Sequence, residues 1–114
     1  MIFDKGVFMR IQKLDQKIIA DIKERLVKVY DPREIYLLEP HREDECDIDI
    51  MIIVDKASIQ RYDLMAEGHK ALIGIKIPKN ILVYTKEEFD DYSKDKSTLS
   101  YLIKQNGKRI YAKA

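Results

Sequence analysis

Two aspartates separated by one residue, Asp47 and Asp49, are the side chains in this sequence best placed to do chemistry. They stand at the start of DIDIMIIV, residues 47–54, which is predicted to be a buried strand. Side chains alternate along a strand, so both carboxylates should point to one face and can converge on one cation. Magnesium takes oxygen ligands and is usually held by one or two carboxylates together with phosphate oxygens. The pair therefore predicts a magnesium site, although most isolated D-x-D triplets are solvated aspartates at a strand start.

The other residues that could act as ligands or nucleophiles have less support from their surroundings. His41 lies in an acidic loop, where an exposed histidine is expected, and His69 falls on an apolar stripe, where a hydrogen-bonded histidine at the edge of the core is expected. Cys46 is expected to face away from the aspartates, because side chains alternate along a strand, which indicates a packed thiol rather than a nucleophile. The sequence contains neither a Cys/His cluster suited to zinc nor a glycine-rich phosphate loop.

A helix and a strand are predicted ahead of the aspartate strand. Apolar residues recur every four positions over residues 12–30, with charged residues opposite, which predicts an amphipathic helix. Asp31-Pro32 ends it, because a residue before proline is pushed out of helical geometry. EIYLL, residues 34–38, predicts a short strand. In residues 47–54 both alternating faces are apolar, so that strand should be central in the sheet and covered on both sides.

Further helices and strands are predicted in the second half of the chain. Ser58 can cap a helix that runs to about Ile73, with Gly74 as its C-terminal stop. The apolar stripe of this helix is predicted to be Ile59, Tyr62, Ala66, His69 and Ile73. The remaining elements are expected to be a strand over 80–85, a short helix over 86–92, a helix opened by Ser97 that runs through Gln105 and is closed by Asn106-Gly107, and a last strand over 109–112.

This order of elements predicts an α/β or α+β domain with a small mixed sheet flanked by helices. The length of 114 residues fits one domain over residues 1–114, of which residues 1–8 fit no pattern and are expected to be an edge strand or a loose extension. The net charge of +1 argues against nucleic-acid binding by bulk charge. A single cysteine, no long apolar run and a charged N-terminus predict a cytoplasmic protein without a membrane segment.

Four stretches, in their order and spacing, resemble the minimal nucleotidyltransferase (MNT) family, small relatives of the polymerase-β-type nucleotidyltransferases. They are REIYLL for the family's first strand, DIDIMIIV for its D-x-D strand, GIKIPKNILVYTKEEFDDY for its third strand and the residues after it, and LIKQNGKRIYA for its closing helix-turn-strand. The resemblance covers residues from about Met9 to Ala112. It implies a nucleotidyltransferase-like fold in which Asp47 and Asp49 bind magnesium, a third carboxylate completes the site, and a Gly-Ser turn grips the nucleotide triphosphate.

The Gly-Ser turn of that family is not found in this sequence. Glu39-Pro40 follows Leu38, and none of the eight residues between Leu38 and Asp47 is glycine or serine. EPHREDEC resembles the family's stretch just after the turn, so the chain reads as if the turn had been cut out between Leu38 and Glu39. Natural loss, an engineered deletion and a segment missing from the sequence would all look the same.

Asn80 stands where the family's third strand carries its carboxylate. An asparagine can offer an oxygen to a metal but cannot act as a base or balance a second divalent charge, which weakens a two-metal mechanism. Glu39 and Arg42 are expected at the nucleotide-phosphate edge, with Arg42 as the nearest cation for a phosphate. An acid from the loop 39–45 could replace the missing carboxylate, although acidic loops are usually just solvated.

The resemblance implies a magnesium-dependent enzyme that transfers a nucleoside monophosphate, typically AMP from ATP, to a protein or small-molecule acceptor, with Asp47, Asp49 and Asn80 as the catalytic set. Such domains often pair with a HEPN-type helical protein, in some systems as the antitoxin of a toxin–antitoxin pair, and a homo-oligomer is a further alternative. The second interpretation is a catalytically inactive partner-binding module with the same fold. The third is a small ligand-binding α+β domain whose D-x-D is coincidental.

Overall fold

Four strands form one mixed sheet at the centre of the domain, of which the structure, a computed structural model, describes residues 14–40, 47–55 and 61–114. The strands are β1 (Glu34–Leu38), β2 (Ile48–Val54), β3 (Lys79–Thr85) and β4 (Lys108–Ala112), in the order β3-β2-β1-β4. β1 is antiparallel to both β2 and β4, whereas β2 and β3 are parallel. The predicted α+β class with a small mixed sheet is therefore confirmed.

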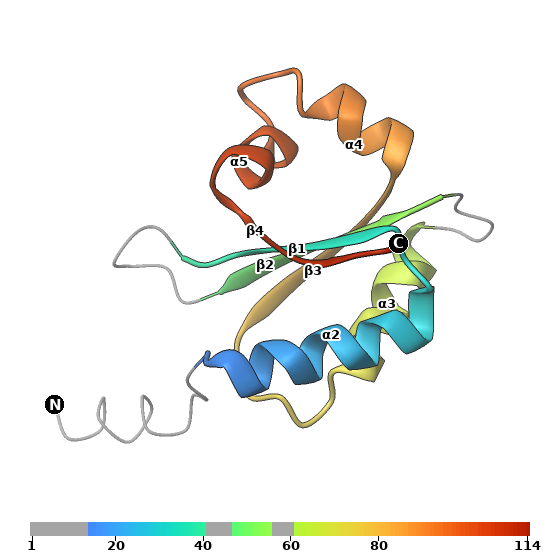
Figure 1. Cartoon of the computed structure of the whole chain (residues 1–114), viewed down its shortest axis with the longest axis vertical. Coiled ribbons are helices and arrows are strands. Elements are labelled where there is room, and N and C mark those ends of the chain that lie inside the picture. The colour runs from blue at the N-terminus through green and yellow to red at the C-terminus, as the bar shows by residue number, and fades with distance from the viewer. Residues whose placement is uncertain (1–13, 41–46, 56–60) are drawn as a thin grey trace, which may run out of the picture.

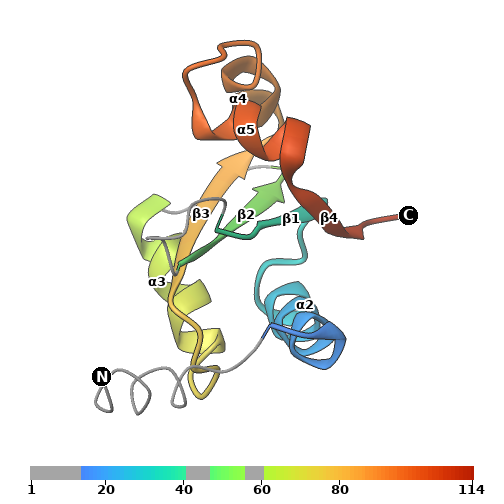
Figure 2. The ribbon, with the colours of Figure 1, turned by 90° about the vertical axis from the view of Figure 1, so that its left-hand side faces the viewer.

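Helices cover both faces of this sheet (Figure 1). α2 (Gln16–Tyr30) and α3 (Arg61–Ala71) lie on one face, and α4 (Lys86–Tyr92) and α5 (Leu99–Asn106) lie on the other, as the rotated view also shows (Figure 2). No helix within the described ranges is both long enough and apolar enough to cross a membrane.

The central strand β2 is buried on both faces, as its sequence predicts. Ile50, Met51, Ile52 and Ile53 are all 0% exposed. Ile50 and Ile52 belong to the core under α2 and α3, whereas Met51 and Ile53 pack with residues of α4 and α5 in a second core. Alternating side chains of one strand thus hold the two helical layers to the sheet. The even-numbered residues of β2 face α2 and α3, so Asp49 shares the α4/α5 face.

The ends of α2 follow from its flanking aspartates. The Asp15 side chain accepts a hydrogen bond from the backbone nitrogen of Ile18 (2.9 Å) and caps the helix, which therefore begins later than the predicted residue 12. Asp31 adopts a left-handed conformation with φ of +46° and ends the helix before Pro32, as predicted.

The predicted inner stripe of α3 is wrong. Ala66, His69 and Ile73 are exposed, Ile73 by 74%. The side chains that pack toward the core are instead those of Leu64, Met65, Ala71 and Leu72. The predicted cap Ser58, together with Ile59 and the Tyr62 side chain, lies outside the described residues.

Gly68 explains why the register of α3 was misjudged. It is buried, and a Cβ at this position would lie 2.6 Å from the Tyr30 hydroxyl oxygen and 3.0 Å from Ile81 Cγ2. The Tyr30 hydroxyl donates a hydrogen bond to the Leu64 carbonyl and so joins α2 to α3. A glycine adds nothing to a hydrophobic pattern, yet here it marks the side of the helix that lies closest to its neighbours.

The two helices of the other layer begin at threonines. Thr85 forms a capping box with Glu88 and starts α4, and its side chain accepts from the Glu88 backbone nitrogen (3.1 Å). Thr98 caps α5, so the prediction that Ser97 opens this helix is wrong by one position. The Ser97 hydroxyl instead donates to the Asp95 carboxylate (2.8 Å).

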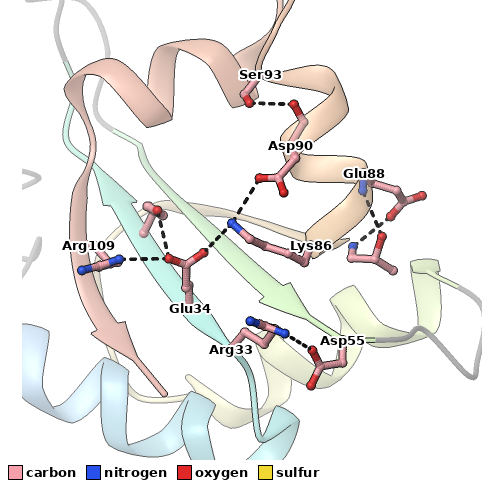
Figure 3. A network of polar contacts seen from close by, with 10 residues as sticks. Arg33, Glu34, Asp55, Lys86, Glu88, Asp90, Ser93 and Arg109 are labelled. Carbon is pink, nitrogen blue, oxygen red and sulfur yellow. Dashed lines mark hydrogen bonds and ion pairs between the residues drawn. The ribbon is translucent and has the colours of Figure 1, made fainter. Parts of the chain in front are cut away.

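A nearly buried carboxylate joins three elements at the start of β1 (Figure 3). The Glu34 side chain is 13% exposed and lies between Arg109 of β4 (3.1 Å) and Lys86 of α4 (3.5 Å). Lys86 also contacts the Asp90 carboxylate at 3.1 Å. Burial lowers the pKa of Lys86, but the hydrogen bond to Asp90 and the charge of Glu34 outweigh it and leave the pKa raised.

Candidate functional site

Asp49 and Asn80 are brought into contact by the parallel pairing of β2 and β3. The two residues are register partners in the ladder, and the Asn80 amide nitrogen donates to Asp49 Oδ1 at 3.0 Å. Asp49 is half-buried and Asn80 is exposed. Because partners on adjacent strands project to the same side of the sheet, both lie on the α4/α5 face. Asn80 therefore lies beside the D-x-D strand.

Asp47 and Glu39 lie at the same end of the sheet as this contact. Asp47 is exposed and directly precedes β2, two residues before Asp49. Glu39 is exposed and directly follows Leu38, which is the register partner of Asp49. The predicted phosphate ligand Arg42 lies outside the described residues, as do His41, Cys46 and the acids at 43–45.

A cavity of about 340 Å³ adjoins the Asp49–Asn80 contact. Its lining comes from β2, β3, α3 and α5: Asp49, Met65, His69, Lys79, Asn80, Ile81, Leu82 and Leu99. His69 is therefore an exposed residue at the candidate site and not the core-edge histidine that the sequence predicted. Together with Lys79 it brings two groups that can carry positive charge to a site otherwise marked by a carboxylate.

Lys79 was missed in the sequence, although it directly precedes Asn80. Its ammonium donates to the Ile75 carbonyl at 2.9 Å, which holds the side chain near the start of β3. Partial burial lowers the pKa of Lys79, because removal from water disfavours the charged form. A desolvated ammonium interacts more strongly with an anion than a fully hydrated one does.

A larger hollow of about 800 Å³ lies at the other end of β3 and along α4. It is lined by Thr85, Glu87, Glu88, Asp90, Asp91, Tyr92 and Lys94, and none of the described residues lines both this hollow and the cavity at Asp49. Four of these seven side chains are acidic, so the hollow does not suit a phosphate ligand. The smaller cavity is the better candidate site, because its lining includes Asp49 and Asn80, two of the residues that the sequence pattern singles out.

The donor set of the site fits a hard cation such as Mg²⁺. The carboxylates of Asp47 and Asp49 offer oxygen ligands, and Mg²⁺ commonly takes only one or two protein carboxylates and keeps several waters. Rotating the Asn80 amide about its terminal bond would present its oxygen in place of the nitrogen that now faces Asp49. Among the described residues there is no group of three or more His, Cys, Asp or Glu side chains that could hold a metal.

Comparisons with protein-family models, with curated proteins and with solved structures find no match to this chain.

Proposed function

We propose that this chain is a minimal nucleotidyltransferase-type domain that binds a nucleoside triphosphate with Mg²⁺ and transfers its nucleoside monophosphate, AMP from ATP, to an acceptor. The observation that carries the proposal is the contact between Asp49 and Asn80 on adjacent parallel strands, with Asp47 two residues earlier at the mouth of β2. Two carboxylates and an amide therefore lie at one end of the sheet, which supports the proposal.

In the proposed reaction, an oxygen or nitrogen of the acceptor attacks the α-phosphorus of ATP. The bond from that phosphorus to the bridging oxygen breaks, pyrophosphate leaves, and the acceptor proton passes to solvent. Mg²⁺, when bound, neutralises charge on the phosphates. Asp47 and Asp49 hold the cation, and Asn80 orients the Asp49 carboxylate through its hydrogen bond. Asn80 supplies no negative charge, so the site suits one strongly held cation better than two.

The second candidate function is a non-catalytic module that keeps the fold and binds a protein partner, such as a HEPN-type helical protein. The Asp49–Asn80 hydrogen bond favours it, because this contact stabilises the carboxylate in the absence of any cation. The sequence Glu39-Pro40 at the end of β1 also favours it, since an acid and a proline offer fewer donors to a triphosphate than a Gly-Ser turn does. Under either candidate we place the protein in the cytosol.

A calorimetric titration with ATP, with and without Mg²⁺, tests the proposal. We expect saturable binding that requires Mg²⁺ and is lost in the double variant Asp47→Asn/Asp49→Asn. A matched control is Asp90→Asn/Asp91→Asn, which removes the same charge from α4 at the other end of β3. Binding that persists unchanged in the first double variant, or no heat at millimolar ATP in the parent protein, would exclude the transferase and favour the partner-binding module.

A further inference from the structure

The cavity beside Asp49 has an apolar part and a charged part. Met65 of α3, Ile81 and Leu82 of β3 and Leu99 of α5 supply the apolar lining. His69 and Lys79 supply two groups that carry or can carry positive charge. Such a combination binds molecules that have an apolar body and an anionic end, because each part of the ligand then meets a surface of matching chemistry.

We infer that this cavity is a binding site for a small oxyanion with an apolar body, held by Lys79 and His69 at its anionic end and by Met65, Leu82 and Leu99 along its body. The ligand class is a compact phosphate monoester or carboxylate. The inference rests on the proposed function in naming this ligand as the acceptor and in assigning a cation to Asp47 and Asp49. The cavity itself opens directly beside the Asp49–Asn80 contact.

The charges of the lining support an anionic ligand. Among the described residues Asp49 is the only acid that lines the cavity, and one of its oxygens already accepts a hydrogen bond from the Asn80 amide. A cation held by Asp47 and Asp49 would cancel the remaining negative charge and leave the Lys79 ammonium as a positive group of the site. A neutral ligand would leave the partly desolvated Lys79 ammonium without a counter-charge.

The size of the cavity supports a small molecule rather than a macromolecular surface. A volume of about 340 Å³ lies at the lower end of the range, roughly 300–1,000 Å³, of sites that enclose small ligands. The lining residues lie on three regular elements and on the first residue of a fourth: β2, β3, α3 and the start of α5. Sites on such elements hold their shape better than sites on loops.

The test uses three probes of one body size: phenyl phosphate, benzoate and phenol. The chain has two histidines, His41 and His69, so the His69 imidazole proton signals are assigned by comparison with the His41→Gln variant. Each probe is titrated into the Mg²⁺-saturated protein and followed by these signals and by the backbone amides of Ile81 and Leu82. We expect saturable shifts with phenyl phosphate or benzoate and at least tenfold weaker binding of phenol. Equal binding of phenol, or no saturation with either anion, would overturn the inference.

Substitutions distinguish a specific binding site from general electrostatic attraction of the anionic probes to the protein. We expect Lys79→Met and His69→Gln each to weaken phenyl phosphate binding about five- to tenfold. Lys108→Met removes the same charge from exposed β4 at the far edge of the sheet and should leave binding unchanged. His69 is exposed, so its replacement keeps the test valid even if Lys79→Met loses stability with its Ile75 contact. A loss in Lys108→Met as large as that in Lys79→Met contradicts the assignment.

Asp49→Asn distinguishes this inference from the proposed function. It removes the negative charge from the cavity, so in protein free of Mg²⁺ phenyl phosphate should bind more tightly to this variant than to the parent, whereas Mg²⁺-dependent ATP binding should be lost. If the parent protein binds phenyl phosphate but no ATP, the cavity assignment stands and the transferase proposal fails. If it binds ATP with Mg²⁺ but no oxyanion probe, the transferase proposal stands and the cavity assignment fails.

Discussion

Asn80 holds the Asp49 carboxylate through a hydrogen bond of 3.0 Å from its amide nitrogen to Oδ1, across the parallel strands β2 and β3. The contact joins the D-x-D strand to the position where the resemblance implies a third carboxylate. An amide satisfies the neighbouring carboxylate without a cation, whereas a carboxylate in its place would repel it. The residue at position 80 therefore determines whether the Asp49 carboxylate faces a hydrogen-bond donor or a like charge when no metal is bound.

Asn80→Asp should make the stability of the domain dependent on a divalent cation. Two facing carboxylates at this separation repel by about 1 kcal/mol if they are well solvated, and by several times more if they are partly desolvated. Because Asn80 is exposed, we expect a loss near the lower value in EDTA and recovery in millimolar Mg²⁺ or Mn²⁺. Thermal unfolding with and without cation measures both effects.

The control for this variant is the exchange Asp49→Asn/Asn80→Asp. It keeps one carboxylate and one amide at the two positions, so it should unfold close to the parent protein in EDTA. Equal destabilisation of the exchange and of Asn80→Asp would show that repulsion is not the cause.

Gly68→Ala should destabilise the domain by about 1–3 kcal/mol, the usual cost of forcing a methyl group into a packed contact. The added Cβ would meet the Tyr30 hydroxyl oxygen at 2.6 Å and Ile81 Cγ2 at 3.0 Å. Since alanine favours helices over glycine, a loss of stability cannot come from helix propensity. Urea denaturation measures the change in the free energy of unfolding.

A second substitution locates the source of that strain. Tyr30→Phe removes the closest atom, so Gly68→Ala should cost less in a Tyr30→Phe background than in the parent protein. Glu67→Ala, at the neighbouring exposed position of α3, is the control for the helix itself and should be nearly neutral. An equal cost of Gly68→Ala in both backgrounds would contradict the contact.

Tyr30 should also make stability fall at alkaline pH. Burial raises its pKa from 10.0 to about 12, with an opposing contribution from a backbone hydrogen bond at Gly68. The unfolded chain therefore loses this proton at lower pH than the folded chain does. The contribution of Tyr30 is fully present below pH 10 and is lost as pH rises toward 12. Urea denaturation at several pH values should show that the free energy of unfolding falls less steeply with pH in Tyr30→Phe than in the parent protein. Parallel curves for the two proteins would refute this role of Tyr30.

Glu34→Gln should lower the free energy of unfolding by about 1–2 kcal/mol, more than the loss of a typical exposed ion pair. Its carboxylate is 13% exposed and contacts both Arg109 and Lys86, so the substitution leaves two cations without this partner. Asp90→Asn removes the more exposed partner of Lys86 and should cost less than about 0.5 kcal/mol. Equal losses for Glu34→Gln and Asp90→Asn in chemical denaturation would mean that the burial of Glu34 contributes nothing to the free energy of unfolding.

The central strand β2 was predictable because both of its faces carry apolar side chains. The end of the helix α2 was predictable because an aspartate and a proline follow it. Both features depend on residues close together in the sequence, so no knowledge of the neighbouring elements is needed to predict them. The register of α3 was not predictable in the same way, because two different stripes along that helix have similar apolar content. The inner stripe contains Gly68, whose role depends on Tyr30 and Ile81, residues distant in the sequence.

The candidate site, too, could be predicted only in part from the sequence. The D-x-D spacing and the place of Asn80 on the next strand could be predicted from period-two alternation and from the sequence resemblance. Their hydrogen bond required the register of β2 against β3. His69 and Lys79 were not expected at the site, because their proximity depends on how α3 and the edge strand meet. The position of Lys79 directly before Asn80 was the one local signal.

The pairing of Leu38 with Asp49 closes the β1–β2 hairpin next to the candidate site. Five residue pairs and two buried faces fix the register of these strands, so the connection between them need not do so. Loop-closure entropy grows slowly with length, and doubling the eight residues between Leu38 and Asp47 would cost only about 0.6 kcal/mol. Under the proposed function, a single insertion or deletion in this connection would change the contacts to a phosphate while the core stays intact, so the length of this connection is where such a domain can vary at little cost in stability.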